Sequence, residues 1–118
     1  MSAHILVVED ETLMADFLAA WLNQLGYEVA LAYDGLEALA HIHAAAPQLV
    51  LVDLMLPSMG GWELVRRIRA EARFQHIPIV VCTARQEAYL PTDLVQGILH
   101  KPFPMDEFTE KIREAFLN

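Results

Sequence analysis

Five residues with carboxylate, hydroxyl or ammonium side chains each follow a short apolar run of the sequence. They are Glu9, Asp10, Asp53, Thr83 and Lys101. If the apolar runs are parallel strands of one sheet, these residues meet at its carboxyl edge, where open α/β sheets bind their ligands. A single acidic residue at a strand end is usually a helix cap or a solvated charge. Five such residues at successive strand ends instead predict a functional site.

The predicted site brings three carboxylates together, and without compensation at least one of them would be pushed toward protonation. A hard divalent cation removes this repulsion. Mg²⁺ is suited because it takes one or two carboxylates, keeps several waters and binds phosphate oxygens. Lys101 then supplies a compact positive charge for phosphoryl oxygens, and Thr83 supplies a hydroxyl donor. The set therefore predicts magnesium-dependent phosphoryl chemistry.

Asp53 is the predicted nucleophile, because a carboxylate can attack phosphorus and form an acyl phosphate. It ends the central predicted strand, whereas Glu9 and Asp10 are adjacent and form a pair suited to holding metal. Positioning and charge neutralisation would supply most of the catalysis, since the loose transition state of phosphoryl transfer requires little else.

Hydrophobic patterning predicts the strands that position these residues. Apolar runs rich in β-branched residues and without polar alternation indicate strands that are covered on both faces. These runs are residues 5–8, 49–52 and 79–82, with a weaker strand at 27–32 and a short last strand at 97–100.

Segments of helical period separate the strands, over residues 14–25, 34–43 and 62–72 and after Pro104. Gly26 is expected to close the first helix. Asp34 and Glu37 fit a capping box at the start of the second. The segment 84–96 has the least regular pattern because Pro91 interrupts it, so we expect a short or irregular fourth helix there.

Strand and helix alternate five times, which predicts an α/β fold with a doubly wound, five-stranded parallel sheet. The expected strand order is 2-1-3-4-5, as in flavodoxin-like folds, with helices on both faces. A chain of 118 residues is long enough for one domain and too short for two, so we expect one domain over residues 1–118.

The composition limits the function classes. With 8 basic and 16 acidic residues the net charge is −8, which opposes binding to nucleic acid or anionic lipid. Arg66, Arg67 and Arg69 are therefore interpreted as a solvated helix face.

Cys82 is the single cysteine, which excludes a disulfide within the chain. Apolar runs fall short of the roughly 20 residues of a transmembrane helix, and no signal-peptide pattern is present, so a cytoplasmic location is expected.

Four motifs together resemble the receiver domains of response regulators, the CheY-like family of two-component signalling. The stretch ILVVEDE at residues 5–11 resembles the opening of these domains, and DLMLPSMGG at residues 53–61 resembles their phosphorylation loop. Thr83-Ala84 and Lys101-Pro102-Phe103 complete the set. The similarity covers essentially the whole chain.

The resemblance implies a phosphoacceptor that catalyses only its own phosphorylation and dephosphorylation. Asp53 would accept a phosphoryl group from a phosphohistidine on a sensor histidine kinase or phosphotransfer protein. The domain would then switch a downstream protein or output domain, as a monomer or weak dimer.

The resemblance also implies roles for the other site residues. Asp10, Asp53 and the backbone carbonyl of Met55 would bind Mg²⁺, and Glu9 would act through a water molecule or indirectly. Thr83 and Lys101 would contact the phosphoryl group. The peptide bond between Lys101 and Pro102 would be cis, an isomer that proline makes accessible.

Two departures from the family pattern concern the usual conformational switch. The family has an aromatic residue three positions before the lysine, where this chain has Ile98. The interval from Thr83 to Lys101 is 101 − 83 = 18 residues, shorter than the family pattern by about one helical turn, or ~4 residues. We therefore expect residues 86–96 to form a short or irregular helix of higher mobility than the rest.

Other functions match parts of this pattern. A receiver-like interaction module that works without phosphorylation is suggested by Ile98 and the altered fourth helix. A phosphohydrolase with an aspartyl nucleophile would share the acyl-phosphate chemistry, but it generally carries a second Asp where this chain has Met55. A flavin-binding protein of the same topology would need amide or hydroxyl donors after the first strand, where this chain is acidic.

Overall fold

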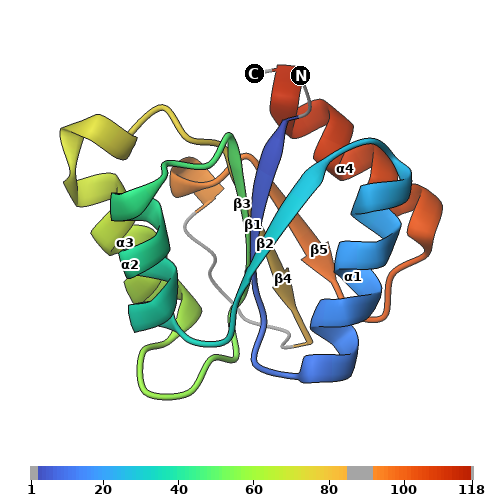
Figure 1. The fold of residues 1–118 in the computed structure, drawn as a ribbon, viewed down its shortest axis with the longest axis horizontal. Coiled ribbons are helices and arrows are strands. Elements are labelled where there is room, and N and C mark those ends of the chain that lie inside the picture. The colour runs from blue at the N-terminus through green and yellow to red at the C-terminus, as the bar shows by residue number, and fades with distance from the viewer. Residues whose placement is uncertain (1–2, 85–91, 118) are drawn as a thin grey trace.

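The computed structural model describes residues 3–84 and 92–117 as a sheet covered by helices (Figure 1). The strands are β1 (His4–Val8), β2 (Glu28–Ala32), β3 (Leu49–Asp53), β4 (Ile79–Thr83) and β5 (Gly97–His100). The α-helices are α1 (Thr12–Gln24), α2 (Gly35–Ala44), α3 (Gly61–Ala70) and α4 (Met105–Leu117). Two 3₁₀ turns, η1 (Ala72–Phe74) and η2 (Thr92–Leu94), lie in the connections.

The sheet is parallel throughout, and its strand order is β2-β1-β3-β4-β5. This order confirms the prediction. Strand β3 lies at the centre, and all five of its residues are buried. Asp53 at its end is paired in register with Cys82, and Thr83 is paired with His100. The strand ends therefore bring the predicted site residues to one edge of the sheet.

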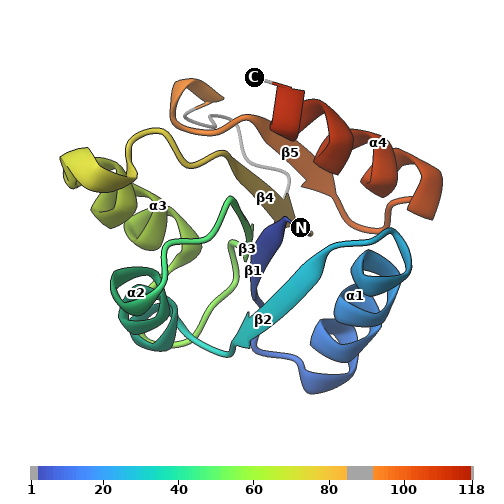
Figure 2. The same cartoon turned by 45° about the horizontal axis from the view of Figure 1, so that its top comes forward.

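Two apolar layers hold the sheet between its helices. Helices α1 and α4 cover one face, and α2 and α3 cover the other (Figures 1 and 2). Leu22 and Phe108 of the first pair pack against alternate strand residues such as Val7. Ile42 and Leu64 of the second pair pack against the residues that face the opposite side. Burial on both faces explains why the strands are apolar without alternation.

Two predicted helix ends are present in the structure. Gly26 has a φ of 98°, a left-handed conformation that glycine adopts without strain. The N–H of Gly26 donates to the carbonyl of Asn23 at 3.0 Å, and that of Tyr27 donates to Leu22 at 3.1 Å. These two bonds form the Schellman motif that ends α1. At the start of α2, the Asp34 carboxylate accepts the N–H of Glu37 at 2.7 Å, as the capping box requires.

Helix α3 differs from its prediction at its end and in the environment of one side chain. It stops at Ala70, because Glu71 is extended (φ −97°, ψ 123°) and the chain continues into η1. Trp62 is half-buried. Arg69, expected in water, is also half-buried and donates hydrogen bonds to neighbouring loops. The reading of Arg69 as a solvated side chain was therefore wrong, whereas Arg66 is exposed.

The connection from β4 to β5 is described in part. Residues 92–96 contain the 3₁₀ turn η2, in keeping with the short or irregular fourth helix that was expected. Residues 85–91 of that prediction lie outside the described residues, and the expected mobility stays a prediction. The final helix begins at Met105, directly after Pro104, whose carbonyl accepts the N–H of Phe108 at 3.1 Å. Across residues 3–84 and 92–117, no helix has both the length and the apolar character needed to cross a bilayer.

Candidate functional site

The carboxyl edge of the sheet positions the predicted residues through backbone contacts. Glu9 follows β1, and its N–H donates to the carbonyl of Ala32 at 3.0 Å. Lys101 follows β5, and its N–H donates to the carbonyl of Thr83 at 2.8 Å. Asp53 and Thr83 are the last residues of their strands. Parallel pairing thus fixes the backbone from which each functional side chain emerges.

Three carboxylates meet at this edge, as predicted. One carboxylate oxygen from each of Glu9, Asp10 and Asp53 lies within 4.8 Å of the others. Glu9 and Asp53 are buried, with 3% and 6% of their surface exposed, whereas Asp10 is exposed. In the described part of the chain this is the one group of three or more His, Cys, Asp or Glu residues with ligand atoms so close together.

Lys101 connects the two buried carboxylates. Its Nζ lies 2.8 Å from Asp53 Oδ2 and 3.2 Å from Glu9 Oε1. The second oxygen of Asp53, Oδ1, accepts the backbone N–H of Met55 at 2.8 Å. The Asp53 carboxylate is therefore held in one orientation by a charged donor and a backbone donor.

The loop after Asp53 is held against the strand end by a close backbone approach at Gly61. The N–H of Gly61 donates to the carbonyl of Leu54 at 3.1 Å. A Cβ on Gly61 would lie 2.5 Å from the Cα of Leu54, so no larger residue fits without a shift of the backbone. The loop also contains Ser58 in a left-handed conformation, with a φ of 66°. This packing places the Met55 N–H beside Asp53.

The electrostatics of the site differ between its two buried acids. Burial raises the pKa of Glu9 to about 7, and hydrogen bonding to Asp53 and repulsion by its charge add to this, with Lys101 opposing. Burial would also raise the pKa of Asp53, but hydrogen bonds from Lys101 and the Met55 N–H lower it below its ordinary value. Burial opposes the charge of Lys101, yet its contacts with Asp53 and Glu9 raise its pKa.

The ammonium group of Lys101 thus contacts two buried carboxylates, and the exposed carboxylate of Asp10 lies beside them. Repulsion by the Asp53 charge adds to the effect of burial on the pKa of Glu9, because the three carboxylates carry more negative charge than Lys101 neutralises. An additional cation with oxygen ligands would relieve this excess. The donor set fits Mg²⁺, which prefers carboxylate and carbonyl oxygens.

Comparison with known proteins identifies the family. Residues 5–113 match the family model of the response regulator receiver domain. The chain belongs to this family. Over 116 residues it is 39% identical to the transcriptional regulatory protein DltR of Streptococcus agalactiae, covering 92% of this chain and 50% of that protein. Over 112 residues it is 35% identical to hybrid signal transduction histidine kinase D of Dictyostelium discoideum, covering 92% of this chain and 7% of that protein.

Solved structures agree with this assignment. The receiver domain superposes on chemotaxis response regulator CheY4 of Vibrio cholerae with a TM-score of 0.90 and 27% identity, covering 98% of this chain and 99% of the other. It superposes on response regulator TrrA of Thermotoga maritima, solved in complex with Mg²⁺ and BeF, with a TM-score of 0.87 and 30% identity over 98% and 99% of the two chains. The domain spans half or less of the two curated relatives named above.

Three further details of the receiver domain bear on the family resemblance. The Lys101-Pro102 peptide bond is cis, as the resemblance implied. Thr83 is fully buried at the end of β4. Ile98, which occupies the position of the family's aromatic residue, is half-buried and packs against the α2 and α3 side of the core. Sequence reasoning missed the Met55 N–H that binds Asp53, although an aspartate side chain at a turn commonly accepts the N–H of the residue two positions later.

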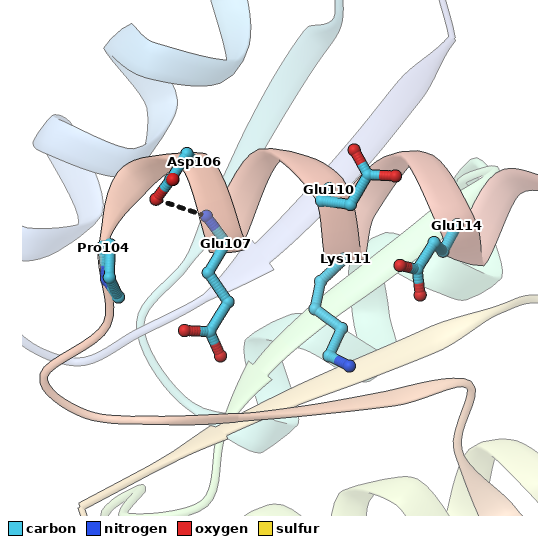
Figure 3. Close-up of a pocket in the computed structure, with 6 residues that line it drawn as sticks. All are labelled: Pro104, Asp106, Glu107, Glu110, Lys111 and Glu114. Carbon is cyan, nitrogen blue, oxygen red and sulfur yellow. Dashed lines mark hydrogen bonds between the residues drawn. The ribbon is translucent and has the colours of Figure 1, made fainter.

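A pocket of about 530 Å³ lies along α4 and shares no residue with the Asp53 site (Figure 3). Its lining consists of Pro104, Asp106, Glu107, Glu110, Lys111 and Glu114. The Asp106 carboxylate accepts the N–H of Glu107 at 2.9 Å, which places negative charge at the positive end of the helix dipole. These carboxylates belong to the acidic surface of the receiver domain.

Proposed function

We propose that this receiver domain accepts a phosphoryl group on Asp53 from the phosphohistidine of a partner protein. The observation that carries the proposal is the contact of 2.8 Å between Lys101 Nζ and Asp53 Oδ2 inside a cluster of three carboxylates. A buried carboxylate with a lowered pKa stays ionised, as a nucleophile must. A fixed ammonium group beside it can hold phosphoryl oxygens.

The proposed reaction moves one phosphoryl group between two side chains. A carboxylate oxygen of Asp53 forms a bond to phosphorus, and the bond between phosphorus and the imidazole nitrogen breaks, its electron pair leaving with the imidazole. Lys101 would transfer its contact from the Asp53 carboxylate to the phosphoryl oxygens, and Thr83 would donate its hydroxyl to another of them. The Met55 N–H keeps Asp53 oriented throughout.

The proposal includes one Mg²⁺ ion. Asp10, Asp53 and the backbone carbonyl of Met55 would bind it, with Glu9 acting through a water molecule or indirectly. The ion would supply positive charge for the phosphoryl oxygens when bound. The structural support is the cluster itself, in which three carboxylates have oxygens within 4.8 Å of one another and Lys101 contacts two of them.

The partners follow from the same chemistry. The donor would be a sensor histidine kinase or phosphotransfer protein, and the receiver domain would act on a downstream protein or an output domain, as a cytoplasmic monomer or weak dimer. The net charge of −8 argues against nucleic-acid or membrane binding by this domain itself. Because Asp53 is both nucleophile and product site, the domain would be a phosphoacceptor and not an enzyme with a separate substrate.

A labelling experiment tests the proposal. Incubation with Mg²⁺ and phosphoramidate, followed by intact mass spectrometry, should show a labile gain of one phosphoryl group. Asp53→Asn should not be labelled, whereas Asp16→Asn, a change to an exposed aspartate of α1, should be labelled normally. Normal labelling of Asp53→Asn would disprove the assignment of the site.

The module that works without phosphorylation is not favoured, because the acidic cluster and Lys101 are assembled at one edge. A phosphohydrolase is also disfavoured, since the position of its second Asp is Met55, which is half-exposed. Steady turnover of a phosphate ester at an enzymatic rate would instead support the phosphohydrolase function.

A further inference from the structure

An apolar groove of about 390 Å³ lies beside the phosphoacceptor site, and the reaction proposed above does not use it. It is lined by Met14, Phe17, Leu18, Ala84, Lys101, Pro102, Phe103 and Met105. Lys101 is the charged member of this lining, and its Nζ is also the group 2.8 Å from Asp53 Oδ2. The groove and the site therefore share one wall.

The groove is formed in advance because contacts within the domain fix its walls. The indole N–H of Trp21 on α1 donates to the hydroxyl of Thr109 on α4 at 3.0 Å. That hydroxyl donates in turn to the carbonyl of Met105 at 2.8 Å. The ring of Phe103 stacks on Phe108, with centroids 5.6 Å apart. A guest would therefore not need to open the groove.

We propose that this groove binds the acyl chain of small acyl phosphates, so that donors with an acyl group longer than acetyl phosphorylate Asp53 preferentially. The inference rests on the proposed phosphoacceptor function and names a substrate class for the same site. The basis of the inference is Lys101, which both lines the groove and contacts Asp53 in the phosphoacceptor site. A lysine stem is a chain of methylene groups that ends in an ammonium group. A donor whose phosphate lies at Nζ can lay its acyl chain along that stem toward Phe17 and Phe103.

The size and chemistry of the groove suit this class of donor. Small-ligand sites measure roughly 300–1,000 Å³ and combine an apolar lining with few polar groups. In the proposed step, an Asp53 oxygen bonds to phosphorus while the bond between phosphorus and the acyl oxygen breaks. The carboxylate leaves with the electron pair, and no proton needs to move. Since donor and product are both acyl phosphates, the step exchanges one mixed anhydride for another.

The test compares acetyl, propionyl and butyryl phosphate as donors for the whole chain in the presence of Mg²⁺. Initial labelling rates are followed by intact mass at low donor concentration and corrected for hydrolysis of each donor. Burial of a methylene group should raise the rate about fourfold for each carbon added. Equal rates for the three donors would overturn the inference and leave the phosphoacceptor function intact. Failure of all three, and of phosphoramidate, would overturn the function itself.

Two variants of α1 locate the effect. Phe17→Ser removes an apolar wall of the groove at a residue that is 51% exposed, and should make the three rates equal. Leu13→Ser changes a residue of the same helix that is 80% exposed and outside the lining, and should preserve the dependence on chain length. Acetyl phosphate should label Leu13→Ser as it labels the unchanged domain. A length dependence that survives in Phe17→Ser would place the acyl chain elsewhere and refute the assignment.

Discussion

Two partly buried cations lie at opposite ends of β4 and β5, and their partners differ in charge. Lys101 follows the carboxyl end of β5 and contacts the carboxylates of Asp53 and Glu9. Arg69 of α3 lies by the amino ends, where its Nη2 donates at 3.1 Å to Gln96 Oε1, which also accepts the N–H of Ile79. Its remaining donors bind the backbone carbonyls of Leu94, Phe74 and Gln75.

The difference distinguishes a structural cation from a functional one. The acceptors named for Arg69 are neutral, and Nε, Nη1 and Nη2 of its guanidinium each donate to at least one of them. Lys101 instead lies beside three carboxylates, which carry more negative charge than it can neutralise, and repulsion by Asp53 adds to burial in raising the pKa of Glu9 to about 7. A site with more negative than positive charge can bind a further cation, and Lys101 can then exchange its contact with Asp53 for a contact with another anion.

Removal of Lys101 should have the largest effect, on phosphorylation. Lys101→Met deletes the positive charge beside Asp53, so the labelling rate with phosphoramidate and Mg²⁺ should fall about 10²- to 10³-fold, as when an oxyanion donor is lost. Lys111→Met, on α4 and away from the site, is the matched control and should label normally. A labelling rate of Lys101→Met within a factor of three of that of the unchanged domain would show that Lys101 is not a functional cation.

Removal of Arg69 should reduce stability and leave phosphorylation unchanged. Arg69→Met leaves the carbonyl of Leu94 and the amide oxygen of Gln96 without their charged donor, which should lower the free energy of unfolding by about 2 to 3 kcal/mol in urea. Arg66→Met, at an exposed residue of the same helix, should change it by less than about 0.5 kcal/mol. Equal losses in the two variants would mean that the Arg69 contacts contribute nothing.

The raised pKa of Glu9, which results first from burial and then from its contacts with Asp53, should appear in the pH dependence of stability. The pKa of Glu9 is about 7 in the folded domain, against 4.5 as its ordinary value. Between these values the folded state binds more protons than the unfolded state, so stability falls as the pH rises. The loss should be on the order of 2 kcal/mol for the metal-free domain.

Urea titrations at several pH values between 5 and 8 measure this fall. Glu9→Gln should flatten the profile, and saturating Mg²⁺ should reduce it in the unchanged domain. Asp53 does not interfere, because its lowered pKa affects stability only as the pH falls below its ordinary value of 3.8. An identical slope in Glu9→Gln would show that Glu9 is not the group that titrates in this range.

The sequence predicted the sheet and the site residues because both depend on local patterns. Uninterrupted apolar runs identify buried parallel strands, and the residues that follow them must lie at one edge. Thr83 and Lys101 could therefore be assigned to one site although 18 residues separate them. The expected order of the strands was that of flavodoxin-like folds, and the cis bond after Lys101 came from the family resemblance; the structure agrees with both.

One feature that sequence reasoning missed depends on contacts between distant segments. Arg69 resembles its neighbours Arg66 and Arg67 in the sequence, and only the return of the chain at Leu94 and Gln96 makes it different. The end of α3 at Ala70 was placed too late, since helical residue types continue into η1. The bond from the Met55 N–H to Asp53 is local, and an aspartate at a turn favours it, so the sequence contained a signal that was not used.

The smallest expected effect concerns a third cation, His43 of α2, which is exposed. Its Nδ1 lies 2.8 Å from the carbonyl of Leu39, and its Nε2 lies 2.9 Å from Glu71 Oε1. Because both partners are acceptors, only the doubly protonated ring can donate to both. The hydrogen bond to Leu39 and then that to Glu71 raise the pKa of His43, while Arg73 opposes them.

Two substitutions should move the pKa of His43 in opposite directions, which an NMR titration of the ring can measure. Glu71→Gln removes the carboxylate and should lower the pKa, whereas Arg73→Gln removes the opposing charge and should raise it. The stabilisation by protonated His43 is complete below its ordinary pKa of 6.5 and is lost as the pH rises through the higher folded value. A pKa that moves the same way in both variants would mean that the Glu71 contact does not form, and that His43, unlike Lys101, has no charged partner.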